Sequence, residues 1–183
     1  EANNPYPHRL WAYDPDAKKY LSNPDEAKEA LKRAQSSLSE EQLKQEIILT
    51  TIPNLEEVGN QVTSQWKNLS INSKLRIESG IAQNFQALLI TQSIPTDPDQ
   101  YTLWHATQEK TNLTKYDSKR TDKDLEEGRK VITEDERKEK YFDFQATLLE
   151  DAPAIFLYFP KYNIAVLKKK VTALNKILSL TNQ

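Results

Sequence analysis

Few side chains in this sequence could carry out bond-making chemistry. The 183 residues contain two histidines, His8 and His105, and no cysteine. A hydroxyl nucleophile needs a base beside it, yet no Gly-x-Ser-x-Gly or comparable motif surrounds either histidine. The lack of cysteine excludes thiol catalysis, disulfides and cysteine metal sites in this segment. The sequence therefore predicts no catalytic residue, and we expect a protein that is not an enzyme.

Metal and phosphate sites are not predicted either. No His-x-x-x-His or Glu-x-x-His spacing, typical of a metal site, is present. Gly59, Gly80 and Gly128 are too far apart to form a phosphate-binding loop. Neighbouring carboxylates such as Glu126 and Glu127 lie among lysines and arginines at helical spacing, which is typical of surface ion pairs. We expect no metal and no cofactor.

The charge balance bears on possible partners. With 25 basic and 27 acidic side chains, the formal net charge is −2. No basic field is present to hold nucleic acid, so we expect no nucleic-acid partner.

No apolar run approaches the roughly 20 residues that span a membrane. The chain begins at Glu1 and contains no methionine, so we expect a processed or excised piece of a longer protein.

One segment, residues 96–108, combines aromatic side chains with polar neighbours. It follows the carboxyl end of a predicted strand, and ligands of open α/β sheets bind in the crevice beyond such ends. Trp104 and His105 are adjacent, so on a helix they would point about 100° apart. One of them could face a cleft while the other packs in the core. The alternative, that Tyr101 and Trp104 only pack a helix onto the sheet, stays open.

The elements that would position this segment follow a strand–helix–strand order. Apolar and β-branched patterns predict strands over 46–52, 73–78 and 86–91. A helix over 54–68, which Asn54 would cap, joins the first two strands, and a short helix is expected at 81–85. The inner face of the longer helix would consist of Leu55, Val58, Val62 and Trp66. Short links between these elements predict a mainly parallel α/β sheet.

Helical patterns lie on both sides of this core. The sequence predicts a helix beginning after Asn23, a short helical turn at 39–41, and longer helices over 119–131 and 134–151. Thr133 would begin a capping box for the last helix. The apolar stripe of the first helix would consist of Ala27, Ala30, Leu31 and Ala34, and that of the last of Tyr141, Phe144, Leu148 and Leu149. Further strands are expected at 154–159 and 164–167, and a final helix at 171–180.

Several stretches resemble the family-5 bacterial extracellular solute-binding proteins, which serve peptide- and nickel-type ABC transporters. The most specific match is 134–158, where polar and apolar positions both agree. Four other stretches carry the resemblance in chain order: 13–34, 46–68, 97–105 and 112–129. Together the matches run from roughly residue 11 to residue 171.

The resemblance implies an α/β fold of the periplasmic-binding-protein type (type II), with a mainly parallel sheet flanked by helices. Such proteins have two lobes that close on a ligand by hinge bending, and this chain would be a fragment forming the C-terminal lobe. Residues 1–22 would then be a leader or linker into the lobe, and 23–153 the α/β lobe itself. Residues 154–183 would hold return strands and a truncated end directed toward the missing N-terminal lobe.

The resemblance also implies a function. The protein would be the substrate-binding component of a bacterial ABC importer, capturing a peptide-like or other small solute and delivering it to a membrane permease. We expect four residues near the cleft: Gln92, Trp104, His105 and Tyr116. Its location would be extracytoplasmic, either periplasmic or at the cell surface. It would meet the membrane only through a lipid anchor that this chain does not include.

The sequence departs from the family pattern at two places. Peptide-binding members place an aspartate for the peptide α-amine where this chain has Ile94, and a glycine of the family is replaced by Ser70. A buried ammonium without a carboxylate is costly, so recognition of free-amine peptides through this position is not expected.

The alternative function is a non-transport interaction or sensory module that presents residues 93–118 to a protein. A hydrolase would need a nucleophile and a base in one pocket, and the sequence offers no such pair.

Overall fold

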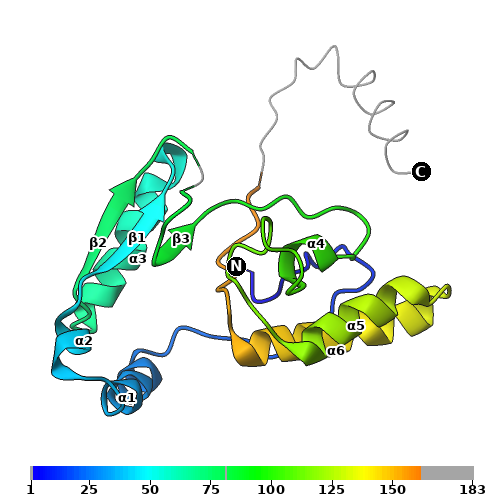
Figure 1. Cartoon of the computed structure of the whole chain (residues 1–183), viewed down its shortest axis with the longest axis horizontal. Coiled ribbons are helices and arrows are strands. Elements are labelled where there is room, and N and C mark those ends of the chain that lie inside the picture. The colour runs from blue at the N-terminus through cyan, green and yellow to red at the C-terminus, as the bar shows by residue number, and fades with distance from the viewer. Residues whose placement is uncertain (1, 81, 162–183) are drawn as a thin grey trace, which may run out of the picture. The chain divides into compact units, whose positions relative to one another are not determined.

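The chain divides into two compact units. The computed structural model describes residues 2–80 and 82–161 (Figure 1). The helical unit consists of Glu1–Lys18 with Pro98–Gln183, and the sheet unit of Lys19–Asp97. The segmentation at 1–22, 23–153 and 154–183 expected from the sequence stays a prediction, and the two compact units have other bounds.

Three parallel strands form the core of the sheet unit. The central strand β1 (Ile47–Thr51) lies between β2 (Ser73–Ile77) and β3 (Ala87–Leu89), so that Leu49 is opposite both Leu75 and Ala87. The parallel sheet predicted from the strand–helix–strand order is therefore confirmed, although β3 is shorter than expected. Residues 82–85 do not form the predicted short helix.

A helix covers one face of this sheet at close range. The 3-10 turn η1 (Pro53–Leu55) leads into α3 (Glu56–Asn68). A Cβ atom on Gly59 would lie 2.6 Å from Leu75 Cδ1, so the helix can approach the sheet this closely because it carries glycine there. The predicted cap Asn54 is wrong: Leu55 precedes α3 without a side-chain cap, because Pro53 already starts a helical turn. Leu55 is buried as predicted, and Val58, Val62 and Trp66 are half-buried.

The first two helices form at their local signals but bury little. In α1 (Pro24–Gln35), the Asn23 side chain accepts the Glu26 N–H at 3.1 Å, and α2 (Glu40–Lys44) begins with a capping box at Ser39. No residue of α1 is buried, so its predicted apolar stripe does not reach a core. Local capping therefore forms these helices although none of their residues is buried.

One turn of the sheet unit carries backbone strain. Ser70, which follows α3, has φ of 63°, in the left-handed region that glycine occupies most easily. A non-glycine residue there costs about 1 kcal/mol. Ser70 in this conformation is therefore a local stability cost.

Two long helices form the core of the helical unit. The single-turn helix α4 (Tyr101–Trp104) precedes α5 (Lys119–Lys130) and α6 (Glu134–Asp151), and α5 and α6 lie side by side (Figure 1). The predicted α6 stripe is confirmed, because all four of its residues are buried: Tyr141, Phe144, Leu148 and Leu149. The Thr133 hydroxyl bonds to the Glu136 carboxylate and does not cap the backbone. None of the helices in the described part of the chain is long and apolar enough to cross a membrane.

The N-terminal segment packs into this core, which its expected role as a leader or linker did not anticipate. Tyr6 is fully buried, with its ring 6.3 Å from that of Tyr141 and 6.1 Å from that of Phe144. Buried Gln145 on α6 donates to the Ala12 carbonyl at 2.8 Å and accepts the Asp14 N–H at 3.1 Å. Irregular backbone is stable here because α6 supplies its hydrogen bonds.

The segment after α6 does not form the expected strand. The helix ends at Asp151, Ala152 follows it with φ of 47°, and residues 154–159 have no strand structure. Ala2 donates a backbone hydrogen bond of 3.0 Å to Leu157, but no ladder forms within the described part of the chain. A strand requires a ladder of backbone hydrogen bonds to a neighbour, and the single bond between Ala2 and Leu157 does not form one. The expected elements at 164–167 and 171–180 lie outside the described residues.

Candidate functional site

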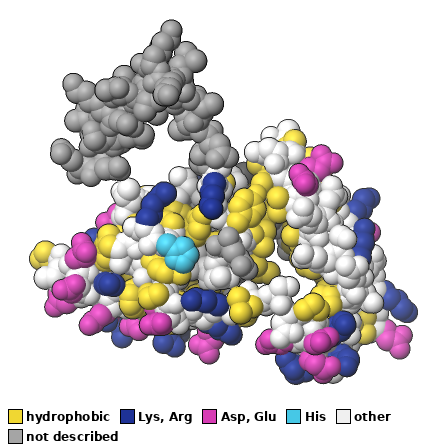
Figure 2. All heavy atoms as spheres, turned by 180° about the vertical axis from the view of Figure 1, so that it is seen from behind, with side chains coloured by type: hydrophobic (Ala, Val, Ile, Leu, Met, Phe, Trp, Pro, Cys, Tyr) yellow, Lys and Arg dark blue, Asp and Glu magenta, His cyan; other side chains and the backbone are white. Residues whose placement is uncertain are grey.

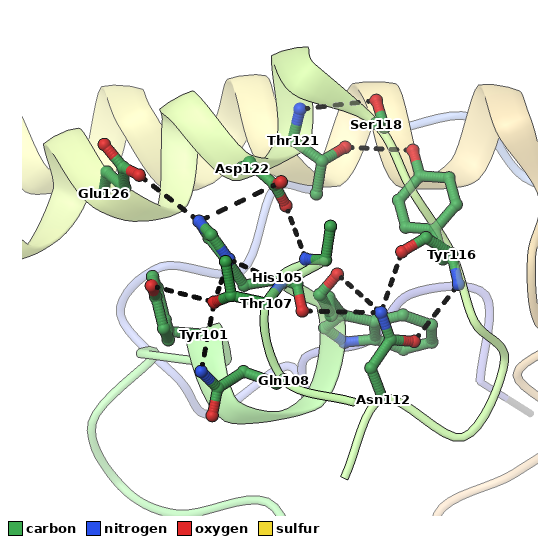
Figure 3. A network of polar contacts seen from close by, with 12 residues as sticks. Tyr101, His105, Thr107, Gln108, Asn112, Tyr116, Ser118, Thr121, Asp122 and Glu126 are labelled. Carbon is green, nitrogen blue, oxygen red and sulfur yellow. Dashed lines mark hydrogen bonds and ion pairs between the residues drawn. The ribbon is translucent and has the colours of Figure 1, made fainter. Parts of the chain in front are cut away.

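Residues 98–118 of the helical unit fold around a polar network, and Figure 3 shows the part of it around His105 and Asn112. Its first member is Gln100, which immediately precedes α4 and is buried. The Gln100 side chain accepts the Trp104 indole N–H at 2.7 Å and donates to the Pro5 carbonyl at 3.3 Å. The one polar atom of the Trp104 side chain is therefore satisfied inside the protein, which leaves its ring for packing.

His105 connects this loop to α5. Its side chain is buried, with only 4% of the residue exposed. Nδ1 accepts the Thr107 N–H at 3.2 Å and lies 2.8 Å from the Thr107 hydroxyl, while Nε2 is 3.3 Å from Glu126 and 3.9 Å from Asp122. Because Nδ1 accepts a backbone N–H, the ring proton of the neutral form is on Nε2 and is donated to Glu126. The same hydrogen bond, followed by the hydrogen bond and the charge of Lys130, lowers the pKa of Glu126.

A stack of side chains reinforces the contact between α4 and α5. The Tyr101 ring lies 4.0 Å from the His105 ring at an interplanar angle of 25°. The Arg129 guanidinium lies 4.1 Å from the centre of the Tyr101 ring and forms an ion pair of 2.8 Å with Asp99. Cation–π and charge-assisted contacts of this kind fix orientation as well as adding stability. The loop is therefore held rigidly against one helix.

Asn112 holds the rest of the loop together and is itself buried. Its Nδ2 donates to three carbonyls, those of Trp104 (3.3 Å), His105 (3.4 Å) and Tyr116 (2.8 Å). Its Oδ1 accepts the Thr114 hydroxyl at 3.0 Å and the Tyr116 N–H at 3.2 Å. One amide side chain thus satisfies both ends of the loop, and the chain between them curves around it.

Tyr116 connects the loop to the far end of α6. Its hydroxyl lies 2.9 Å from the Thr121 hydroxyl and donates to the Asp151 carboxylate. Its ring meets the Trp104 ring edge-on, with centroids 6.5 Å apart. Burial, with Asp151 as the next cause, raises the pKa of Tyr116. The tyrosine is therefore a neutral hydrogen-bond donor at physiological pH.

The four residues expected near a ligand cleft fall into two groups. Trp104, His105 and Tyr116 lie together in the helical unit, where their polar atoms bond to other parts of the chain. Gln92 belongs to the sheet unit and is exposed, with its amide bonded to the Ser93 carbonyl at 3.1 Å. Contact with a ligand stays a prediction for all four.

Sequence reasoning missed two members of the network, Gln100 and Asn112. Both are polar residues in turn-rich sequence, and neither lies in an apolar pattern that would signal burial. Asn112 does precede Tyr116 by four residues, and an asparagine in such a loop can bond to nearby backbone. That local signal predicts a turn, but not that the turn is buried.

The chain Thr107–His105–Glu126 has the residue types of a hydroxyl nucleophile, a base and a carboxylate. However, Nδ1 of His105 is shared with the Thr107 backbone N–H, and the two residues are only two apart, as in a local turn. This arrangement explains the histidine as an element of loop structure. Among residues 2–80 and 82–161, no group of three or more histidine, cysteine, aspartate or glutamate side chains could hold a metal ion.

The surface supplies two further observations. An open groove of about 890 Å³ in the sheet unit follows the carboxyl end of β1 and is lined by Pro53, Asn54, Glu56, Glu57, Asn60, Gln61, Ser64 and Gln65. None of the four predicted ligand residues lines this groove. On the face seen in Figure 2, lysine and arginine side chains lie among aspartates and glutamates, so the described residues there form no continuous basic surface.

Comparison with known proteins gives relatives but no family model that matches. The oligopeptide-binding protein AppA of Bacillus subtilis (strain 168) is 26% identical over 122 residues, which cover 61% of this chain and 22% of AppA. The solved structure of AppA from Bacillus subtilis in complex with a nonapeptide matches 87% of this chain and 36% of that protein, with a TM-score of 0.77 and 25% identity.

Two other solved structures share the fold. NikZ from Campylobacter jejuni, in complex with Ni(L-His), matches with a TM-score of 0.70 and 23% identity over 83% of this chain and 35% of its own. DppA from Helicobacter pylori, in complex with the peptide STSA, matches with a TM-score of 0.71 and 23% identity over 83% of this chain and 32% of its own. The expected resemblance and the α/β fold of type II periplasmic-binding proteins are thereby confirmed. The chain spans about a fifth to a third of the length of these relatives.

Proposed function

We propose that this chain is part of the substrate-binding component of a bacterial ABC importer, and that it forms the C-terminal lobe. The whole protein would capture a peptide-like or other small solute between two lobes and deliver it to a membrane permease. The observation that carries the proposal is the match to AppA, by sequence and by fold, because AppA is named as an oligopeptide-binding protein and was solved with a nonapeptide.

The site geometry supports capture rather than reaction. The 98–118 loop is ordered in advance by Gln100, His105 and Asn112, and a preformed surface loses little entropy when a ligand binds. The matched relatives are named as binding proteins, and the Thr107–His105 contact has a structural explanation. We therefore propose that the protein is not an enzyme.

Location and cargo follow from the same proposal. The protein would act outside the cytoplasm, and would be held to the membrane through a lipid anchor. Ile94 is half-buried and apolar, so it offers no carboxylate to a peptide α-amine. We propose that any peptide cargo is held by other groups than its free amine, because an unpaired ammonium would be costly to bury.

A thermal-shift screen of the full-length protein tests this function. Free peptides, N-acetylated peptides, oligosaccharides and metal chelates would each be added in excess, and the recovered solute would be checked by mass spectrometry. One class is expected to raise the unfolding free energy by about 2.7 kcal/mol at 100 times its Kd, and to be recovered intact. No shift with any class, or a cleaved solute, would contradict the proposal.

A further inference from the structure

A carboxyl group lies buried where α5 packs on α6. Asp124 is 7% exposed, and its Oδ2 atom has no hydrogen-bond partner in the described part of the chain. It belongs to the buried stripe of α5, together with Thr121, Leu125 and Gly128. Burying an ionised oxygen without a partner is costly, so buried carboxylates are ordinarily hydrogen-bonded or paired with a cation. Asp124 therefore calls for an explanation that neither the loop network nor solute binding provides.

The charged groups around Asp124 do not offset the cost of burying its ionised carboxyl group. On α6, Asp143 repels the ionised form and Lys140 attracts it, while on α5 Glu127 repels it and Arg120 attracts it. Lys140 is engaged with Glu127, at 2.8 Å, and is not an exclusive partner for Asp124. Burial, followed by the charge of Asp143, raises the pKa of Asp124 to about 6. The cationic neighbours only reduce this increase.

We propose that Asp124 makes the α5–α6 contact a pH-sensitive one, which tightens when the carboxyl group takes up a proton and loosens when it ionises. Protonation removes the repulsion from Asp143 and the cost of burying a charge, and it gives the side chain an O–H donor. In the unfolded chain the same carboxyl would titrate near 3.8. The folded state therefore binds the proton more tightly, and this stabilisation is lost as the pH rises from about 4 through about 6.

The contact lies on the helix that also anchors the candidate site. From α5, Asp122 accepts the Ala106 N–H at 3.0 Å, and Glu126 accepts from His105 at 3.3 Å. Asp124 lies between these two residues in the sequence and belongs to the stripe of α5 that is buried. A looser α5–α6 contact at neutral pH would thus leave the support of the 98–118 loop less rigid than at acidic pH.

Urea unfolding of the protein at pH 5.0 and pH 7.5 tests the proposal, with the wild type compared to Asp124→Asn. Between these two pH values the ratio of the unfolding equilibrium constants, wild type over variant, is expected to rise about tenfold. Taking this ratio removes the contributions of all other titrating groups that the two proteins share. A ratio that is the same at both pH values would overturn the proposal.

Two surface variants keep the test decisive if Asp124→Asn does not fold. Asp143 is exposed, and its negative charge is the like charge that acts most strongly on Asp124. In Asp143→Asn, the unfolding equilibrium constant is therefore expected to increase less between pH 5.0 and pH 7.5 than in the wild type. Asp135→Asn removes an exposed charge at the start of α6 and is expected to leave that rise unchanged. Equal rises in these two variants would contradict the assignment to Asp124.

Discussion

Replacing Tyr6 by alanine is expected to destabilise the helical unit by about 4 kcal/mol, within the usual range for removing a large buried aromatic side chain. The Tyr6 ring is fully buried against Tyr141 and Phe144, and its hydroxyl donates to the Pro98 carbonyl. The change would leave a cavity and an unsatisfied carbonyl at the point where two distant parts of the sequence meet. Urea unfolding, followed by far-UV circular dichroism, measures the loss.

Two further variants calibrate this result. Tyr6→Phe keeps the ring and removes only the hydroxyl, so a loss of about 1 kcal/mol is expected. Tyr20→Ala removes a tyrosine that is 50% exposed and is expected to change stability by less than about 0.5 kcal/mol. If Tyr6→Ala behaved like Tyr20→Ala, the N-terminal segment would be a linker and not part of the core.

Asn112→Ala is expected to cost about 3 kcal/mol, because it leaves several buried polar groups without partners. The side chain bonds to the carbonyls of Trp104, His105 and Tyr116 and accepts the Tyr116 N–H. Water could reach some of these groups in the variant, so we expect less than the sum of the individual bonds. Urea unfolding gives the free energy, and hydrogen exchange shows whether the loss is confined to residues 98–118.

The matched control is Asn84→Ala in the sheet unit. Asn84 is exposed, and the hydrogen bond that it accepts from Arg76 uses its backbone carbonyl, which alanine keeps. Its replacement is therefore expected to leave both the unfolding free energy and the protection of the loop unchanged. A loop whose exchange is the same in Asn112→Ala and in Asn84→Ala would show that the buried amide does not organise it. In that case the preformed site would lose its main support.

Elements with strong local signals could be predicted from the sequence. The α6 stripe follows a clear helical period, and its four predicted apolar residues are all buried. The β-branched run of β1 predicted the central strand, and the short links between β1, α3 and β2 predicted parallel pairing. Asn23 and Ser39 cap the helices that they precede, because capping depends on only a few neighbouring residues.

Features that depend on distant contacts could not be predicted in this way. The proline-rich first residues have no periodicity, yet Tyr6 is buried because α6 provides a complementary surface. Conversely, the apolar residues of α1 have the right spacing but no described partner that buries them. The apolar run 154–159 has strand composition, but pairing and not composition decides whether a strand forms.

The candidate site could likewise be predicted only in the part that has local signals in the sequence. Sequence reasoning found the segment around Trp104 and His105 from its residue types, and Tyr116 lies in the same unit. It did not find that Gln100 and Asn112 are buried, because an amide in a turn looks the same in sequence whether it faces solvent or core. The Trp104 ring packs against Tyr116 and Phe156 within the helical unit, and the alternative that it only packs a helix onto the sheet stays open. A ligand contact by its remaining surface is still a prediction.

Titration calorimetry of the full-length protein, with a solute found in the thermal-shift screen, tests the central claim most directly. The account predicts saturable binding of one solute per protein. It also predicts binding at least about 100-fold weaker to the 183-residue chain alone, because this chain spans only about a third of the structures that it matches. Absence of binding to the full-length protein, or equal affinity for the chain alone, would contradict a solute site shared between two lobes.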